Sequence, residues 1–209
     1  MSSPCSLLAL FLPAWPLASL PAETASAQEP IPPARDVRID GLVAAISADR
    51  IERDVRTLVG FGTRNTLSDT LSPTRGIGAA RRWIKSELDS ISTACGGCLE
   101  VSYQRVMIAG EERIPDSTWV VSVVAVLRGT TDPDRYVIMT GDIDSRVSDV
   151  LNAIDSSPGA NDNASGMAGV LEAARAITSS GHSFPASIAF AGLSGEEQGL
   201  YGGERMAQI

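Results

Sequence analysis

The chain has 209 residues, which is long enough for one domain with a buried core. A hydrophobic share of 44% and a mean hydropathy of +0.07 argue against a disordered or membrane-embedded chain. The net charge of −8, with no run of basic residues, argues against a nucleic-acid partner.

Residues 1–27 have the pattern of a secretory signal, although Met1 to Pro4 lack the usual Lys or Arg. An apolar run from Leu7 to Leu20 precedes Ala25-Ser26-Ala27, a typical cleavage site. The run is shorter than the ~20 residues that span a bilayer, and prolines interrupt it, so we expect no stable membrane insertion. We predict an exported protein, periplasmic or extracellular.

Helical patterns follow a proline-rich segment, from which we predict an extended lead-in over residues 28–46. Ser47 is a candidate N-cap for a helix that runs through about Val59. Ser72 and Pro73 are predicted to start a second helix. Its apolar face is formed by Ile77, Ala80, Ile84, Leu88 and Ile91.

Two cysteines come next, in Cys95-Gly96-Gly97-Cys98. Such a pair can form a redox centre, half of a zinc site or a small disulfide. No second pair and no nearby His completes a zinc site. In an exported protein the simplest interpretation is a local disulfide that holds a loop.

The second half of the chain alternates strand and helix patterns. Strands are predicted at Leu99 to Ile108 and at Thr118 to Leu127, and a short apolar run, typical of a buried strand, covers Tyr136 to Thr140. A helix from about Ala164 and a buried strand over Ala186 to Ala191 complete a βαβ unit, which implies parallel strands. We therefore predict an α/β fold with a three-layer α/β/α architecture and a mixed, centrally parallel sheet.

Three short stretches in the last third of the chain stand out, because each one lies at the end of a regular element. They are Gly141-Asp142-Ile143-Asp144-Ser145-Arg146, Pro158-Gly159-Ala160-Asn161-Asp162-Asn163-Ala164-Ser165-Gly166 and Gly195-Glu196-Glu197-Gln198-Gly199-Leu200. Their carboxylates are Asp142, Asp144, Asp162, Glu196 and Glu197. Like charges in one place do not all stay ionised without a cation, so the stretches predict a metal site if they converge.

In this order, the stretches resemble those of the co-catalytic di-zinc aminopeptidase family, peptidase clan MH. The resemblance covers about residues 58–209 and implies two metal ions, zinc in the family. By motif position Asp162 resembles the bridging ligand, Asp142 a ligand of the first ion and Glu197 a ligand of the second. Glu196 resembles the general base, and Asp144 resembles the carboxylate that orients a ligand. The implied substrate is a peptide that loses its amino-terminal residue.

Each residue also has a plainer interpretation. Asp162 could cap the helix that follows it. Glu196 and Glu197 could be the solvated start of a helix, and Asp142 and Asp144 could be ordinary turn residues. The only histidine, His182, precedes the strand at its amino end, so a surface position away from the site is expected.

Two departures from the family pattern bear on activity. Asp142 stands where the family has a His ligand, which favours oxygen ligation and admits manganese or another divalent ion besides zinc. The family also has a further Asp and a final His ligand beyond the Glu-Glu motif, and neither follows before Ile209. Residues 47–209 are therefore expected to be the N-terminal part of a zinc-peptidase-like catalytic domain, incomplete at the C-terminus and poorly active alone.

The leading hypothesis is an exported metallo-aminopeptidase. A glutaminyl-cyclase-like enzyme with one zinc ion is a second possibility on the same scaffold. A third is a non-catalytic, peptidase-like binding module. The paired Glu196 and Glu197 favour an enzyme, because a binding module needs no base beside a ligand.

Overall fold

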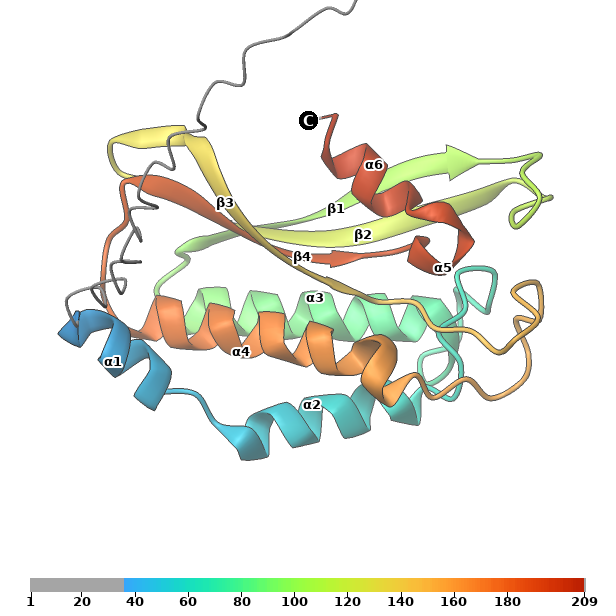
Figure 1. Cartoon of the computed structure of the whole chain (residues 1–209), viewed down its shortest axis with the longest axis horizontal. Helices are drawn as coiled ribbons and strands as arrows, with labels where there is room; N and C mark the ends of the chain where they lie inside the picture. Colours follow the sequence, from blue (N-terminus) through green and yellow to red (C-terminus); the bar gives the residue numbers. More distant parts are fainter. Residues whose placement is uncertain (1–35, 209) are drawn as a thin grey trace, which may run out of the picture. The chain divides into compact units, whose positions relative to one another are not determined.

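The computed structural model describes residues 36–208, so the predicted signal and the first part of the lead-in lie outside the described residues. The chain forms α1 (Val37–Ala44), α2 (Ala48–Gly60), α3 (Gly76–Ala94), β1 (Leu99–Ile108), β2 (Thr118–Leu127), β3 (Asp132–Asp142), a short turn η1 (Ala160–Ala164), α4 (Ser165–Ser179), β4 (Ala186–Leu193), α5 (Glu196–Gly199) and α6 (Tyr201–Met206). Figure 1 shows these elements along the chain.

The described strands form one mixed sheet in the order β1-β2-β4-β3. The pairs β1–β2 and β2–β4 are antiparallel, whereas β3 and β4 run parallel, with Val137 opposite Ile188. Helices α3 and α4 cover one face of the sheet, and α6 lies on the other face against β1 and β2 (Figure 1). The predicted βαβ unit and the three-layer α/β/α architecture are confirmed.

The core lies between the sheet and the layer formed by α3 and α4. All five apolar residues predicted for one face of α3 are buried, and Leu88 is fully buried. They pack against Val123 of β2, Phe190 of β4 and Leu171 of α4. Burial of each such side chain contributes roughly 1.5–3 kcal/mol, so this interface holds the strands that carry the candidate site.

Strand β3 differs from the prediction of a buried strand. Tyr136, Val137, Ile138 and Met139 are 42%, 58%, 52% and 40% exposed. The reason is topological, since β3 pairs only with β4 among the described residues and therefore forms an edge of the sheet. The strand also begins at Asp132, upstream of the predicted start at Tyr136, and its register shifts between Asp132 and Tyr136.

Two helix starts also differ from the prediction. Residues 37–44 of the expected extended lead-in form α1, because the Asp36 carboxylate accepts a hydrogen bond from the Arg38 N–H and caps the helix. Helix α3 begins at Gly76 and not at Ser72. The Ser72 hydroxyl accepts hydrogen bonds from the N–H groups of Thr74 and Arg75, which makes a turn before the helix. The predicted cap of α2 is confirmed, since Ser47 Oγ accepts from the Arg50 N–H at 3.3 Å.

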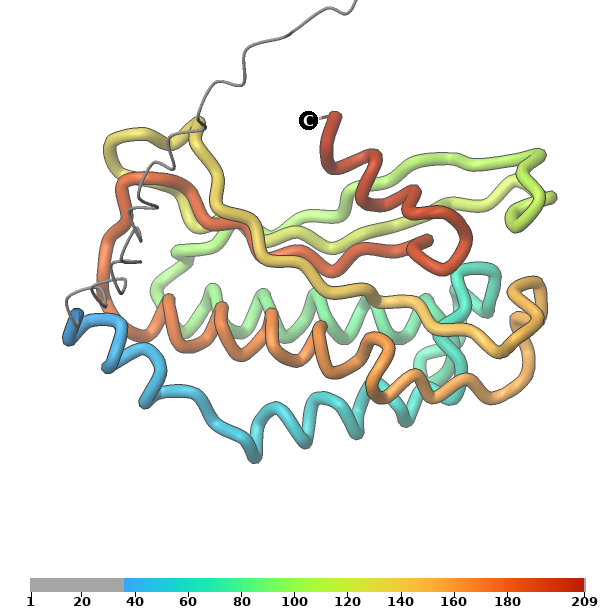
Figure 2. Tube along the Cα trace, viewed as in Figure 1, coloured from blue at the N-terminus to red at the C-terminus, as the bar shows by residue number. Residues whose placement is uncertain are grey.

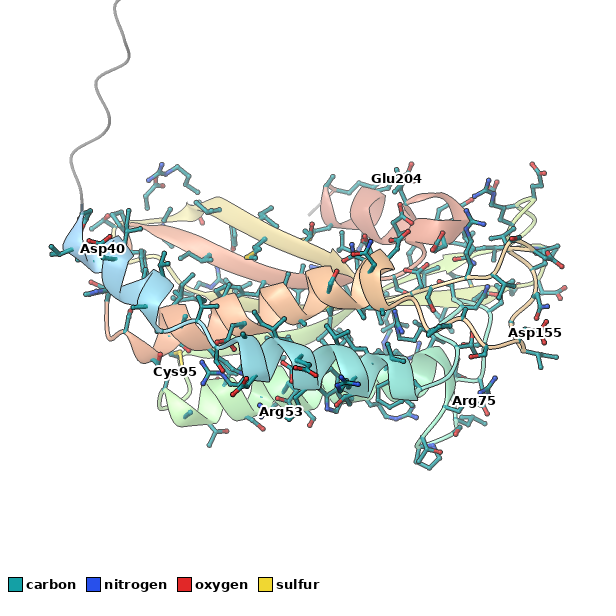
Figure 3. The ribbon with its side chains drawn as sticks, turned by 60° about the horizontal axis from the view of Figure 1, so that its bottom comes forward. Asp40, Arg53, Arg75, Cys95, Asp155 and Glu204 are labelled. Carbon is teal, nitrogen blue, oxygen red and sulfur yellow. A yellow bond between two sulfur atoms is a disulfide. The ribbon has the colours of Figure 1, made fainter. Side chains whose placement is uncertain are left out.

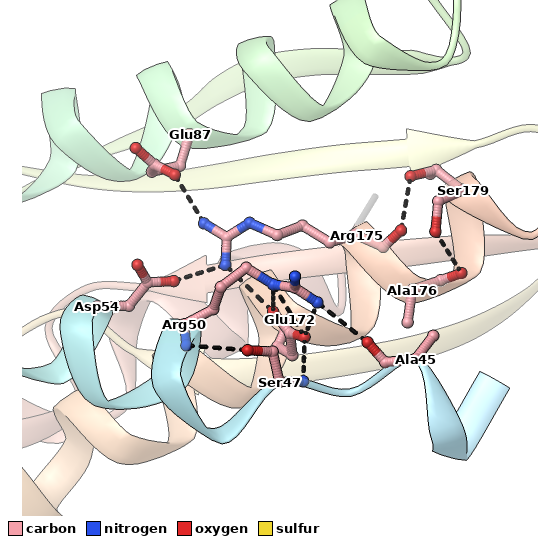
Figure 4. Close-up of polar contacts among 10 residues, drawn as sticks. Ala45, Ser47, Arg50, Asp54, Glu87, Glu172, Arg175, Ala176 and Ser179 are labelled. Atoms are coloured by element: carbon pink, nitrogen blue, oxygen red, sulfur yellow. Dashed lines mark hydrogen bonds and ion pairs between the residues drawn. The ribbon is translucent and has the colours of Figure 1, made fainter.

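An ion-pair network joins α2, α3 and α4 on the outer side of the helical layer (Figure 4). Arg175 of α4 pairs with Asp54 of α2 at 2.6 Å and with Glu87 of α3 at 2.6 Å. The buried Glu172 accepts hydrogen bonds from Arg50 Nη2 at 2.6 Å and from the backbone N–H of Ser47 at 2.7 Å. These contacts fix the three helices relative to one another.

The predicted local disulfide is confirmed, with Cys95 bonded to Cys98 directly after α3. Its position beyond the last turn of α3 is visible in Figure 3. Among residues 36–208, no helix combines the length and the apolar character needed to cross a membrane.

Candidate active site

The three carboxylate-bearing stretches meet at one end of the sheet. Asp142 ends β3, and Glu196 begins α5 shortly after β4. Because the two strands are parallel, both residues lie at the carboxyl end of the sheet. The stretch with Asp162 forms η1, which leads into α4. Figure 2 shows that the segments that follow β3 and β4 lie at the same end of the sheet. Ligand sites of open α/β sheets lie at the carboxyl ends of the strands.

Asp144 is the most buried carboxylate of the group, with 1% of its surface exposed. Its oxygens accept hydrogen bonds from the Thr66 hydroxyl at 3.0 Å and from the backbone N–H groups of Glu196 and Glu197 at 3.3 and 3.1 Å. Burial raises the pKa of Asp144 to about 7, although these donors oppose the rise. Asp144 is therefore no ordinary turn residue, because it ties the loop after β3 to the start of α5.

Four further carboxylates lie close enough to influence one another. Burial raises the pKa of Asp142, and the negative charges of Asp162 and Glu197 raise it further. Burial also raises the pKa of Glu196, together with the charges of Asp142, Glu197 and Asp162. The structure thus brings together the residues that the sequence predicted to converge. Their mutual repulsion contributes to the raised pKa values of Asp142 and Glu196.

Glu197 is engaged by a cation of the chain itself. Arg146 Nε lies 2.6 Å from Glu197 Oε2. Within residues 36–208, no group of three or more His, Cys, Asp or Glu side chains is arranged so that it could hold a metal ion. The donor chemistry nevertheless fits a divalent cation, because the half-buried Asp142 and Glu197 and the exposed Asp162 bring carboxylate oxygens together from three separate stretches.

Arg64 is a residue of this region that the sequence analysis missed. It is 1% exposed, and its guanidinium donates to the carbonyl groups of Ile143 at 2.8 Å, Pro158 at 2.7 Å and Gly159 at 3.0 Å. These bonds connect the first carboxylate-bearing stretch to the second. Burial lowers the pKa of Arg64 to about 10, while the charge of Asp144 opposes that change. No local pattern indicates this role, since the carbonyls of Ile143, Pro158 and Gly159 lie 79 to 95 positions away in the sequence.

Thr66 was also missed. Its hydroxyl donates to Asp144 and accepts from the Gly195 N–H at 3.2 Å, so it joins the loop before α3 to the third stretch. Arg146 was part of a noted motif, but its sequence position gave no sign that its side chain would reach Glu197.

The plainer interpretations can be compared with the contacts. Asp162 is exposed and does not cap α4, whose N-cap is Ala164 and has no side-chain cap bond. Glu196 and Glu197 do begin a helix, but α5 has only 4 residues and both carboxylates face other charges. His182 is exposed and precedes β4, at the opposite end of that strand from Glu196.

Sequence comparisons place these residues among known proteins. The model of the family described as Peptidase family M28 matches residues 122–208. A probable zinc metalloprotease from Pyricularia oryzae is 43% identical over 195 residues, which cover 93% of this chain and 38% of that protein. The chain spans about two fifths of the length of the relatives it matches.

Solved structures share the fold. The LapA aminopeptidase of Legionella pneumophila is 22% identical with a TM-score of 0.60, and the match covers 82% of this chain and 41% of that one. A glutaminyl cyclase from Porphyromonas gingivalis is 22% identical with a TM-score of 0.57, covering 76% of this chain and 51% of that one. At these identities the likeness concerns the fold alone.

Proposed function

Because residues 122–208 belong to peptidase family M28, we propose that the whole protein is a zinc-dependent aminopeptidase. Its substrate is a peptide, from which it removes the amino-terminal residue by hydrolysis. The observation that supports this proposal most strongly is the convergence of Asp142, Asp162, Glu196 and Glu197 from three separate loops at the edge where β3 and β4 end.

The surroundings of each residue support a different role in the proposed reaction. Asp142, Asp162 and Glu197 would hold the metal, with Asp162 shared between two ions, while zinc would supply polarisation of the scissile carbonyl and activation of water. Glu196 acts as the general base, because it lies beside the carboxylates that would hold the metal, and burial and their charges raise its pKa above the ordinary value. Asp144 positions Glu196 and Glu197 by accepting hydrogen bonds from their N–H groups.

The carboxylate set also supports a proposal about the activity of residues 1–209 alone. Catalytic zinc typically has three protein ligands. With Asp162 shared, Asp142 and Glu197 give each of two ions only two. We therefore propose slow turnover by this stretch alone, and manganese as an alternative ion because all of these donors are oxygens.

Two other functions compete with the aminopeptidase. A glutaminyl cyclase with one zinc ion is favoured only by the shared fold. A non-catalytic module is favoured by Asp142, which stands where the family pattern has His. The retained Glu196, half-buried beside the other carboxylates, favours the hydrolase over the module.

We also propose that the protein is exported. The bonded Cys95–Cys98 pair supports this, since disulfides persist in oxidising compartments. Amino-terminal sequencing of the secreted protein should then begin at Gln28, and an intracellular protein that begins at Met1 would refute export.

Hydrolysis of an aminoacyl chromogenic substrate by the whole protein tests the function. We expect activity that a chelator removes and zinc restores, and that Glu196→Gln lowers by at least about 100-fold, the usual effect of losing a general base. Glu204→Gln on α6 is the control, because Glu204 is exposed and does not contribute to the charge cluster. Undiminished hydrolysis by Glu196→Gln would refute the assignment, and cyclisation of an amino-terminal glutamine without hydrolysis would favour the second candidate.

A further inference from the structure

A basic cavity lies apart from the carboxylate cluster, between α3 and the hairpin of β1 and β2. It has a volume of about 270 Å³. Its walls are formed by Arg81, Arg82, Tyr103, Arg105, Trp119 and Val121. In a chain with a net charge of −8, three arginines around two aromatic rings are a local reversal of charge.

The strand register explains why this surface is open. Arg105 pairs with Val121 and Met107 pairs with Trp119, so these side chains share one face of the sheet. Farther along β2 the same face carries Val123 and Ala125, which are buried in the core beside α3. Near the start of β2, however, Trp119 remains 54% exposed and Met107 43% exposed.

The positive charge in the cavity is not neutralised by the described residues. The side chains of Arg81 and Arg105 have no hydrogen-bond or ion-pair partner within residues 36–208. Arg105 instead lies 5.6 Å from the centre of the Tyr103 ring. Burial and the charge of Arg82 lower the pKa of Arg81, with a further contribution from Arg105, while Tyr103 opposes them.

Two acidic residues on the neighbouring segments are already engaged. Asp89 pairs with Lys85 at 2.7 Å, and Asp69 accepts hydrogen bonds from the N–H groups of Leu71 and Ser72. Arg175 in the network of Figure 4 is surrounded by three carboxylates, which shows how the same chain pairs an arginine that has a structural role. Arg81 and Arg105 are therefore available to an external anion.

A second cavity of about 490 Å³ adjoins the first and shares Arg81 and Trp119 with it. It is lined by the loop 66–71 and by residues 117–119, which include several hydroxyl side chains. Thr66, at one end of this lining, contacts Asp144 of the candidate active site. The two cavities together give a polar groove that is longer than a single inorganic ion requires.

We propose that Arg81, Arg105 and Trp119 form a binding site for an acidic peptide segment, separate from the metal-ligand carboxylates. Each guanidinium offers a planar set of donors that matches a carboxylate, and the exposed indole offers an apolar surface beside it. The adjoining groove accommodates the peptide backbone along the hydroxyl-bearing loop. This site does not depend on the proposed hydrolase activity.

Calorimetric titration of the protein with an N-acetylated, C-amidated tetraglutamate peptide tests the site, because blocked ends prevent removal of an amino-terminal residue. We expect saturable binding that Arg81→Gln and Arg105→Gln each weaken about tenfold, the loss expected for one charge-assisted hydrogen bond. Arg53→Gln is the matched control, since Arg53 is an exposed arginine on α2 (Figure 3) and should leave binding unchanged. Melting curves of all variants verify folding.

Two further ligands test whether the site requires the charge of the peptide and whether it prefers a peptide to a free inorganic anion. The blocked tetraglutamine peptide, which has the same length without charge, should not bind measurably. Inorganic phosphate should compete only weakly with tetraglutamate. The proposal is overturned if both glutamine and glutamate peptides bind alike, if phosphate binds more tightly than the peptide, or if the two cavity variants bind as the wild type does.

Discussion

Glu172→Gln tests whether the ion-pair network on the helical layer stabilises the fold. The Glu172 side chain is 1% exposed and accepts hydrogen bonds from Ser47, Arg50 and Arg175. Glutamine keeps the size of the side chain but removes the negative charge and replaces one acceptor oxygen with a donor. That donor then faces a guanidinium, which offers only donors of its own.

The magnitude follows from the bonds that are lost. A hydrogen bond to a charged group contributes about 1.5–3 kcal/mol, and an unsatisfied buried group adds a cost of similar size. Arg50 recovers part of this loss, because its side chain is 38% exposed and can be solvated. We therefore expect Glu172→Gln to lower the free energy of unfolding by roughly 2–4 kcal/mol.

Urea unfolding, followed by circular dichroism, measures this change. Glu52→Gln is the matched control, since Glu52 forms an ion pair with Arg56 on α2 but is 62% exposed. An exposed pair of this spacing contributes only about 0.3–0.5 kcal/mol. Equal losses for the two variants would show that burial does not strengthen the Glu172 contacts, and the reasoning would be wrong.

The stabilisation by Glu172 should also depend on pH. Burial favours a higher pKa for Glu172, but the hydrogen bonds from Arg50 and Ser47 outweigh it and hold the pKa below its ordinary value. The stabilisation is therefore fully present above the unfolded pKa of about 4.3 and is lost as the pH falls through the lower folded value. The difference in stability between wild type and Glu172→Gln should shrink below about pH 4 and stay constant from pH 5 to 7.

Three smaller changes have defined outcomes in the same unfolding assay. Gly78→Ala should destabilise by about 1–3 kcal/mol, because its Cβ would collide with the backbone of Thr70. Gly169→Ala within α4 should stabilise by about 0.5–1 kcal/mol, since nothing lies near the added methyl group; equal effects at the two glycines would contradict the packing. Thr66→Val should cost about 1–3 kcal/mol, because the buried Asp144 loses a donor, and an unchanged midpoint would show that this bond contributes nothing.

The parts of the fold that depend on local patterns were predictable. The limits of β1 and β2 and the capping of α2 by Ser47 match the sequence prediction, because β-branched composition and side-chain caps act over a few residues. The start of α3 was not predictable in this way. The Ser68 hydroxyl accepts from the Ile77 N–H at 2.8 Å, so the residue that binds the first turn lies nine positions upstream.

Strand order and long-range contacts account for the other differences. The apolar composition of β3 matches that of a buried strand, and only the order β1-β2-β4-β3 leaves Val137 and Ile138 exposed. At the candidate site, short motifs identified the carboxylates that gather there. The same motifs gave no indication of Arg64, which binds carbonyls 79 to 95 positions away, or of the pairing of Arg146 with Glu197.

Zinc binding by the protein and by Asp162→Asn is the most direct test of the central claim that the three stretches form one cation site. Calorimetric titration at neutral pH should show that Asp162→Asn weakens zinc binding by at least about tenfold, because the shared ligand is lost. Asp155→Asn, an exposed carboxylate elsewhere on the loop before η1 (Figure 3), should bind zinc as the wild type does. Equal zinc affinity of Asp162→Asn and the wild type would contradict the account.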